Sequence, residues 1–188
     1  MGWGSHTRTR HRRLPVLALT AALAVAGVGA GCGGAGSGSK AADPPSGTPP
    51  VEIPLTGGAK LRVAGLPKEW VSLGSTPLAS SAPAGAKMLS FVKGQPEDLV
   101  AGPKSLVSFE AVPADAAGRA FVARTLAGRK RAIGHRQIHV VPGPGAGPTT
   151  ATGSAVFKTG DYYIVASWTG VDQVTLEPAF GQTDVVSG

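Results

Sequence analysis

Apolar and polar positions follow three different patterns along this chain. Residues 14–30 carry no charge and are mostly Leu, Ala, Val and Gly, whereas residues 33–50 show no apolar periodicity and are rich in Gly, Ser, Ala and Pro. From residue 51 onward, short stretches alternate apolar with polar residues, which is typical of β-strands. The patterns predict a leader over residues 1–31, a disordered tether over 32–50 and one folded domain over 51–188.

The alternating stretches predict an antiparallel sheet with one buried and one solvated face. A polar stretch over 74–85, which contains proline, predicts a loop between two of its strands. Tyr162–Thr169 carries apolar residues on both faces, so we expect it at the centre of the sheet, joined to the preceding strand by a hairpin. The expected strands are Val51–Leu55, Lys60–Ala64, Lys87–Lys93, Ser105–Val112, Lys130–Val141 with a bend at Gly134, Ser154–Lys158 and Tyr162–Thr169.

One helix is predicted over Pro113–Gly128, because the range begins with a proline that suits a first turn and ends at a glycine. A second helix begins near Asp172, and Pro178 restricts it. Strands followed by a helix and more strands predict an α+β fold, with an antiparallel sheet and a helix packed on one of its faces. The first helix should bury a stripe formed by Ala117, Phe121, Val122, Thr125 and Leu126.

The leader has the parts of a secretory signal. A basic head precedes an apolar run of 17 residues, Leu14–Ala30, which is at or below the roughly 17–25 residues of a membrane-spanning helix. Glycines near its end further weaken a helix there. The head contains no acid and four arginines, Arg8, Arg10, Arg12 and Arg13.

The end of the leader, Val28-Gly29-Ala30-Gly31-Cys32, resembles the lipobox of bacterial lipoproteins. The resemblance rests on Ala30, Gly31 and Cys32, while Gly29 departs from the leucine usual in the family. It implies that Cys32 receives a diacylglyceryl group, becomes the new N-terminus and anchors an exported protein to the outer face of the cytoplasmic membrane. The abundance of Ala, Gly, Pro, Arg and Val is similar to that of actinobacterial proteins.

The charge of the chain belongs largely to the leader. The whole chain has 18 basic and 11 acidic side chains and a net charge of +7, and four of the basic ones lie before Leu14. The remaining 14 against 11 leave a net of +3, so the basic composition does not indicate a nucleic-acid partner. Cys32 is the only cysteine, which excludes an internal disulfide and a thiolate metal site.

Two motifs suggest chemistry but lack the necessary context. Ser90 to Lys93 and Lys158-Thr159-Gly160 match the S-x-x-K and K-T-G parts of the penicillin-binding-protein signature. Ser90 lies in a strand-like stretch and the third element of the signature is missing. His135 and His139, four residues apart on a strand, are separated by roughly 13 Å and do not share a metal ion. We therefore expect no catalytic site, no metal and no cofactor.

The most unusual charge feature is a basic stretch without acids between Asp115 and Asp161. It suits an anionic wall polymer, phospholipid headgroups or an acidic protein, although basic residues also decorate solvated surfaces without a partner. The stretch contains Arg119, Arg124, Arg129, Lys130, Arg131 and Arg136.

These features predict a membrane-anchored envelope lipoprotein with a small, non-catalytic binding or accessory domain. Its partners are the membrane, through Cys32, and an anionic envelope polymer or another envelope protein. One alternative is a carrier or sensor that shelters an apolar ligand in a curved sheet. Another is a hydrolase that uses Ser90 or a histidine.

Overall fold

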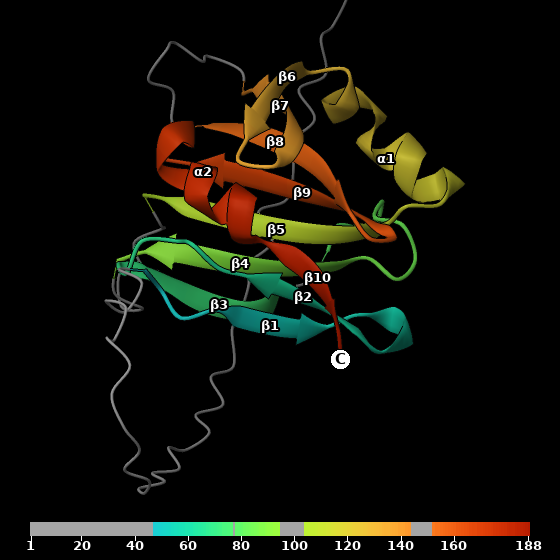
Figure 1. The fold of residues 1–188 in the computed structure, drawn as a ribbon, viewed down its shortest axis with the longest axis horizontal. Coiled ribbons are helices and arrows are strands. Elements are labelled where there is room, and N and C mark those ends of the chain that lie inside the picture. The colour runs from blue at the N-terminus through green and yellow to red at the C-terminus, as the bar shows by residue number, and fades with distance from the viewer. Residues whose placement is uncertain (1–46, 77, 95–103, 144–151) are drawn as a thin grey trace, which may run out of the picture. The chain divides into compact units, whose positions relative to one another are not determined.

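The computed structural model describes residues 47–76, 78–94, 104–143 and 152–188, which form two antiparallel sheets and two α-helices (Figure 1). The predicted leader, Cys32 and the first part of the predicted tether lie outside the described residues. The elements are β1 (Val51–Pro54), a 3₁₀ turn (Thr56–Gly58), β2 (Ala59–Val63), β3 (Trp70–Thr76), β4 (Lys87–Lys93), β5 (Leu106–Pro113), α1 (Ala116–Leu126), β6 (Arg129–Ile133), β7 (Arg136–Pro142), β8 (Thr152–Thr159), β9 (Tyr162–Thr169), α2 (Gln173–Gln182) and β10 (Asp184–Ser187).

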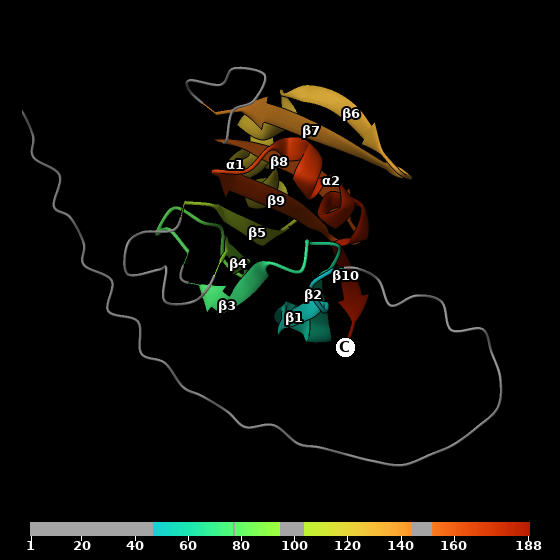
Figure 2. The same ribbon diagram turned by 90° about the vertical axis from the view of Figure 1, so that its left-hand side faces the viewer.

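The larger sheet has seven strands in the order β3-β4-β5-β9-β8-β7-β6 (Figure 2). Strand β9 is the fourth of the seven, which confirms the central position predicted from its two apolar faces. The smaller sheet has the order β1-β2-β10. The fold is α+β with antiparallel sheets and helix packed against sheet, as the order of elements predicted.

One face of the large sheet packs on α2 and the small sheet. Its side chains alternate along each strand, so that Val107, Phe109 and Ala111 of β5 are fully buried. The ring of Phe109 lies 6.2 Å from that of Phe91 and 6.4 Å from that of Phe180 on α2. Edge-to-face rings at these distances add to the stabilisation from burial. Aromatic side chains therefore fill the layer between the sheet and α2.

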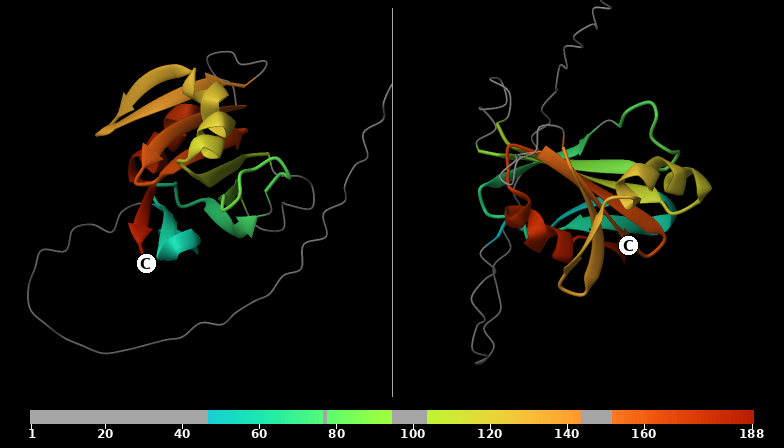
Figure 3. Two further views of the ribbon diagram at one scale, coloured as in Figure 1. Left: turned by 90° about the vertical axis from the view of Figure 1, so that its right-hand side faces the viewer. Right: turned by 90° about the horizontal axis from the view of Figure 1, so that it is seen from above.

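The opposite face of the large sheet carries α1, which contacts β7, β8 and β9 (Figure 3). Gly118 brings the helix close to the sheet, because a Cβ at this position would lie 1.9 Å from the Pro113 carbonyl oxygen. Asp115 caps the helix by accepting a hydrogen bond of 2.8 Å from the Gly118 amide. Thus α1 begins three residues later than predicted, because Pro113 belongs to β5.

The buried stripe of α1 differs from the predicted one. Gly118 and Val122 are buried, whereas Phe121 is 38% exposed and Ala117 is exposed. The prediction placed the stripe by side-chain hydrophobicity and considered Gly118 only as a residue that weakens the helix. The close approach at this glycine rotates the helix, which moves Phe121 toward solvent.

Three further elements differ from their predicted form. The stretch predicted as one bent strand over Lys130–Val141 is a hairpin of β6 and β7, because Gly134 adopts a φ of 57° at the turn. Strand β3 extends into the predicted loop, with a register shift between Ser72 and Gly74. Strand β10 was not predicted and pairs with β2.

The described chain starts within the predicted tether. Gly47 forms an isolated bridge with Pro67, and the Thr48 hydroxyl donates to the Pro67 carbonyl at 2.6 Å, so residues 47–50 pack on the fold. Figure 1 shows this segment, coloured cyan, entering beside β1 and β3, on the other side of the fold from α1. In the described part of the chain, neither helix is long and apolar enough to cross a membrane.

Candidate binding surface

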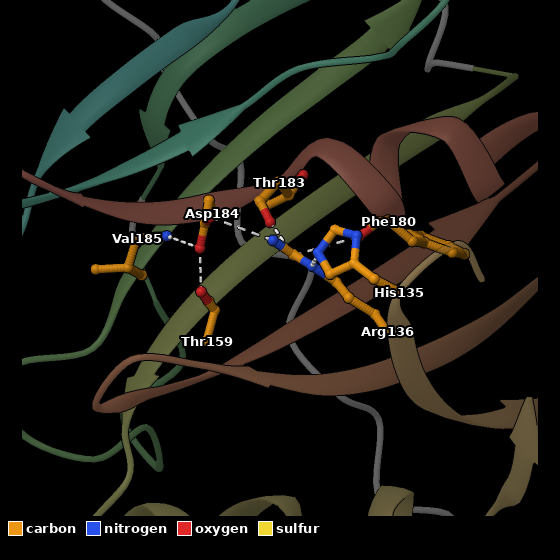
Figure 4. A network of polar contacts seen from close by, with 7 residues as sticks. All are labelled: His135, Arg136, Thr159, Phe180, Thr183, Asp184 and Val185. Carbon is orange, nitrogen blue, oxygen red and sulfur yellow. Dashed lines mark hydrogen bonds and ion pairs between the residues drawn. The ribbon is translucent and has the colours of Figure 1, made fainter. Parts of the chain in front are cut away.

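The six basic residues of the predicted patch divide into two groups. Arg136 has the most contacts (Figure 4). Its guanidinium donates to the carbonyl oxygens of Phe180, at 3.4 Å, and Thr183, and its Nη2 lies 3.3 Å from Oδ2 of Asp184. The side chain is only 11% exposed and lies over the Phe157 ring, 5.2 Å from its centroid. Arg136 therefore ties β7 to the end of α2 and the start of β10.

The carboxylate of Asp184 completes this arrangement, which we call the Arg136 network. Its Oδ1 accepts hydrogen bonds from the Thr159 hydroxyl and, at 2.9 Å, from the Val185 amide (Figure 4). Arg131 makes a similar but more exposed link, with its Nη1 3.4 Å from Oε1 of Glu177 on α2. Arg131 and Arg136 thus stabilise the contact between the β6–β7 hairpin and α2.

The other four residues lie on α1 and at the start of β6. Their side chains are exposed, and no acidic group among the described residues lies within ion-pair distance of them. Gly128 joins the two elements and packs against Val140 and Val141 of β7, which keeps the end of α1 beside the start of β6. Lys130 points to the α1 side of the sheet, whereas Arg129 shares its strand face with Arg131 at the edge strand β6. We call this group the α1 surface: Arg119, Arg124, Arg129 and Lys130.

A pocket of about 410 Å³ opens beside the α1 surface. Its lining includes Arg124 and Thr125 of α1, Val141 of β7 and Ser154 of β8. Arg124 therefore shares the wall of this pocket with two hydroxyl-bearing side chains, Thr125 and Ser154. A guanidinium with neighbouring hydroxyls is suited to a carboxylate or phosphate group of a ligand.

Hydroxyl side chains continue from this pocket across the sheet. The strand register pairs Ser154 with Ser167, Ser167 with Ser108, and Ser108 with Ser90. All four lie on the α1 face, since their neighbours along each strand point into the aromatic layer. The sequence could not reveal this row, because its members come from four strands that are distant in the chain.

Glu110 lies beside this row, two residues after Ser108 on the same face of β5. Burial raises the pKa of its carboxyl group above the ordinary value, because an ionised carboxylate loses solvation there. Its Oε1 is buried and has no hydrogen-bond partner among the described residues. The same holds for the Thr152 hydroxyl on β8, so two unsatisfied polar groups flank the row.

The motifs considered for catalysis are not assembled in the structure. The buried Ser90 hydroxyl shares a hydrogen bond of 2.9 Å with Thr76, while Lys93 lies 3.6 Å from a carboxylate oxygen of Glu69. Three residues apart on a strand, Ser90 and Lys93 point to opposite faces of the sheet. His135 lies in the turn between β6 and β7, whereas His139 lies within β7, so they do not share the strand face that we expected.

A second pocket, of about 610 Å³, lies where the chain enters the fold. Pro49, Pro50, Leu66, Pro67 and Pro178 contribute to its lining. Its wall also contains Thr48, whose hydroxyl is hydrogen-bonded within the fold, and Gln182, but no charged side chain, so it offers no charge to orient an ionic ligand. The α1 surface with its adjoining pocket is the stronger candidate site.

Comparison with known proteins does not assign this fold or site to a family. No protein-family model, no curated protein and no solved structure matches the chain.

Proposed function

We propose that this chain is a lipid-anchored protein of the cell envelope whose folded domain binds an anionic envelope component through the α1 surface. The observation that carries the proposal is the exposure of four cations without ion pairs among the described residues. By contrast, Arg131 and Arg136 form ion pairs with Glu177 and Asp184. The α1 surface therefore keeps its positive charge available for a partner.

The lipobox-like segment ending at Cys32 supports the location at the membrane. In this proposal Cys32 supplies the attachment, and residues 47–50, which pack beside Pro67, are the point where the chain enters the folded domain.

The domain acts, in this proposal, by binding and not by catalysis. Ser90 is buried and points away from the side of the sheet that Lys93 occupies. The layer that a carrier would need for an apolar ligand contains the rings of Phe91, Phe109, Trp168 and Phe180. These observations favour a surface ligand over the carrier and hydrolase alternatives.

Fractionation of cells that express the full chain tests the anchoring. We expect the wild-type protein in the membrane fraction, labelled by palmitate, and the Cys32→Ala protein without label. Equal labelling of the two proteins would contradict lipidation at Cys32. Binding is tested separately, so that an error about the anchor does not affect the result.

Affinity for a fluorescent polyanion tests the binding surface. We expect Arg124→Gln/Arg129→Gln/Lys130→Gln to weaken binding of polygalacturonate by at least about tenfold, because charges that release counterions are lost. The matched control is Lys68→Gln/Lys87→Gln/Lys104→Gln, which removes the same charge from exposed positions elsewhere. Equal losses in both variants would show that only net charge matters and would refute a dedicated surface.

A further inference from the structure

The α1 face of the large sheet offers a line of hydrogen-bonding groups beside the basic pocket. Ser154 lies in the pocket wall, Ser167 is exposed on β9, and Ser108 is partly exposed on β5. With adjacent strands roughly 4.8 Å apart, the three hydroxyls span about 10 Å. They form a straight row because their strands pair in register without a bulge at these positions.

Two further polar atoms lie beside this row but are closed to a ligand. The hydroxyl of Thr152 and Oε1 of Glu110 are buried from solvent and have no hydrogen-bond partner among the described residues. The accessible groups are the serine hydroxyls and Arg124 in the pocket wall, so this face offers hydrogen-bond donors and acceptors with a cation at one end.

We propose that the anionic component is an acidic polysaccharide whose sugar hydroxyls lie along Ser154, Ser167 and Ser108 while an acidic substituent enters the pocket at Arg124. This inference rests on the proposed function and specifies its ligand. A sugar ring presents several hydroxyls that both donate and accept hydrogen bonds, which matches the serine hydroxyls of the row.

The alternative polyanions match less of this surface. A polyphosphate offers only acceptors and negative charge, so it can accept from the serine hydroxyls but has no donor for their oxygen atoms. A vesicle surface presents its charges in a plane and does not reach a row that runs from a pocket across the sheet. A sugar polymer satisfies the hydroxyl row and the cation at the same time.

The test compares two soluble polyanions of matched charge, polygalacturonate and polyphosphate, on the wild-type protein and on Ser154→Val/Ser167→Val. We expect wild type to prefer polygalacturonate. The double variant should lose about fivefold to tenfold in affinity for this sugar polymer, as expected for one or two lost hydrogen bonds, and keep its affinity for polyphosphate. Valine suits a strand, and circular dichroism verifies that the variant folds. If it does not fold, Ser167→Ala replaces it.

The matched control is Ser75→Val/Ser187→Val, which places the same substitution at exposed strand positions away from the row. Equal binding of both polymers, unchanged by Ser154→Val/Ser167→Val, would overturn the polysaccharide inference and leave the proposed function standing. Failure of the wild-type protein to bind either polymer would instead refute the proposed function. A loss of sugar binding in the control as large as in the row variant would also overturn the inference.

Discussion

The two faces of the large sheet use the same residue types in different ways. On the α2 face, Arg131 and Arg136 contact acids and backbone carbonyls, and aromatic rings fill the space between sheet and helix. On the α1 face, Arg119, Arg124 and Lys130 are exposed and serine hydroxyls form a row across the strands, while Arg129 is exposed at the start of the edge strand β6. The comparison indicates that the α2 face stabilises the fold, whereas the α1 face is available for a ligand.

Among the substitutions considered, one at Arg136 should lower the free energy of unfolding most. Arg136→Met keeps an apolar chain over the Phe157 ring but removes the guanidinium, so the carbonyls of Phe180 and Thr183 lose this donor and Asp184 loses its ion pair. We expect the free energy of unfolding to fall by about 2–3 kcal/mol, measured by urea denaturation. Arg62→Met is the control, because Arg62 makes only an exposed contact with Glu52 at 4.0 Å. Similar losses in both variants would contradict the structural role of Arg136.

Glu110→Gln should have a smaller effect on the free energy of unfolding, and this effect should depend on pH. Because burial raises its pKa, the native state keeps the proton at pH values where the unfolded chain has released it. Below the ordinary pKa both states are protonated and Glu110→Gln should have little effect. As the pH rises through the raised pKa, the wild type loses stability relative to Glu110→Gln. Urea denaturation at about pH 4 and at pH 7 measures the unfolding free energies of the wild type and Glu110→Gln. The same difference between the two proteins at both pH values would contradict a raised pKa of Glu110.

Removal of the Arg131–Glu177 ion pair on the α2 face should lower the free energy of unfolding by a smaller amount. Arg131→Gln breaks an ion pair whose partners are 46% and 26% exposed. We expect a loss of at most about 0.5–1 kcal/mol in unfolding free energy, which high salt reduces further. A double-mutant cycle with Glu177→Gln isolates the pair. A coupling as large as the loss at Arg136 would show that the hairpin depends on both arginines equally.

The smallest effect on stability is expected on the α1 face. Arg124→Gln/Arg129→Gln/Lys130→Gln should change the unfolding free energy by less than about 0.5 kcal/mol, because no described acid pairs with these residues. A large loss of stability in this variant, seen in the same urea titration, would assign these cations to the fold and remove the contrast between the two faces.

Local patterns predicted much of the fold. The alternation in Lys87–Lys93 and Tyr162–Thr169 predicted β4 and β9 with their observed bounds. Strand β3 was missing from the expected strands, because its register shift near Gly74 disrupts the alternation. Strand β10 has only four residues and depends on pairing with β2, far away in the sequence. Helix α2 continues through Pro178, since burial of Leu176, Ala179 and Phe180 outweighs the lost hydrogen bond.

The candidate site was predictable only in part. The sequence indicated a basic stretch without acids, but it could not show which cations are paired. The partners of Arg131 and Arg136 are Glu177 and Asp184, which lie more than 40 residues later and meet them only through α2 and β10. The serine row depends in the same way on the order of strands β4, β5, β9 and β8.

Hydrogen–deuterium exchange with and without polygalacturonate tests the difference between the two faces most directly. We predict that the polymer protects the end of α1, the start of β6 and the facing parts of β8 and β9. The amides of α2 and β10 should exchange as in the free protein. Protection confined to α2, β10 or the entry segment 47–50 would contradict the assignment of binding to the α1 face.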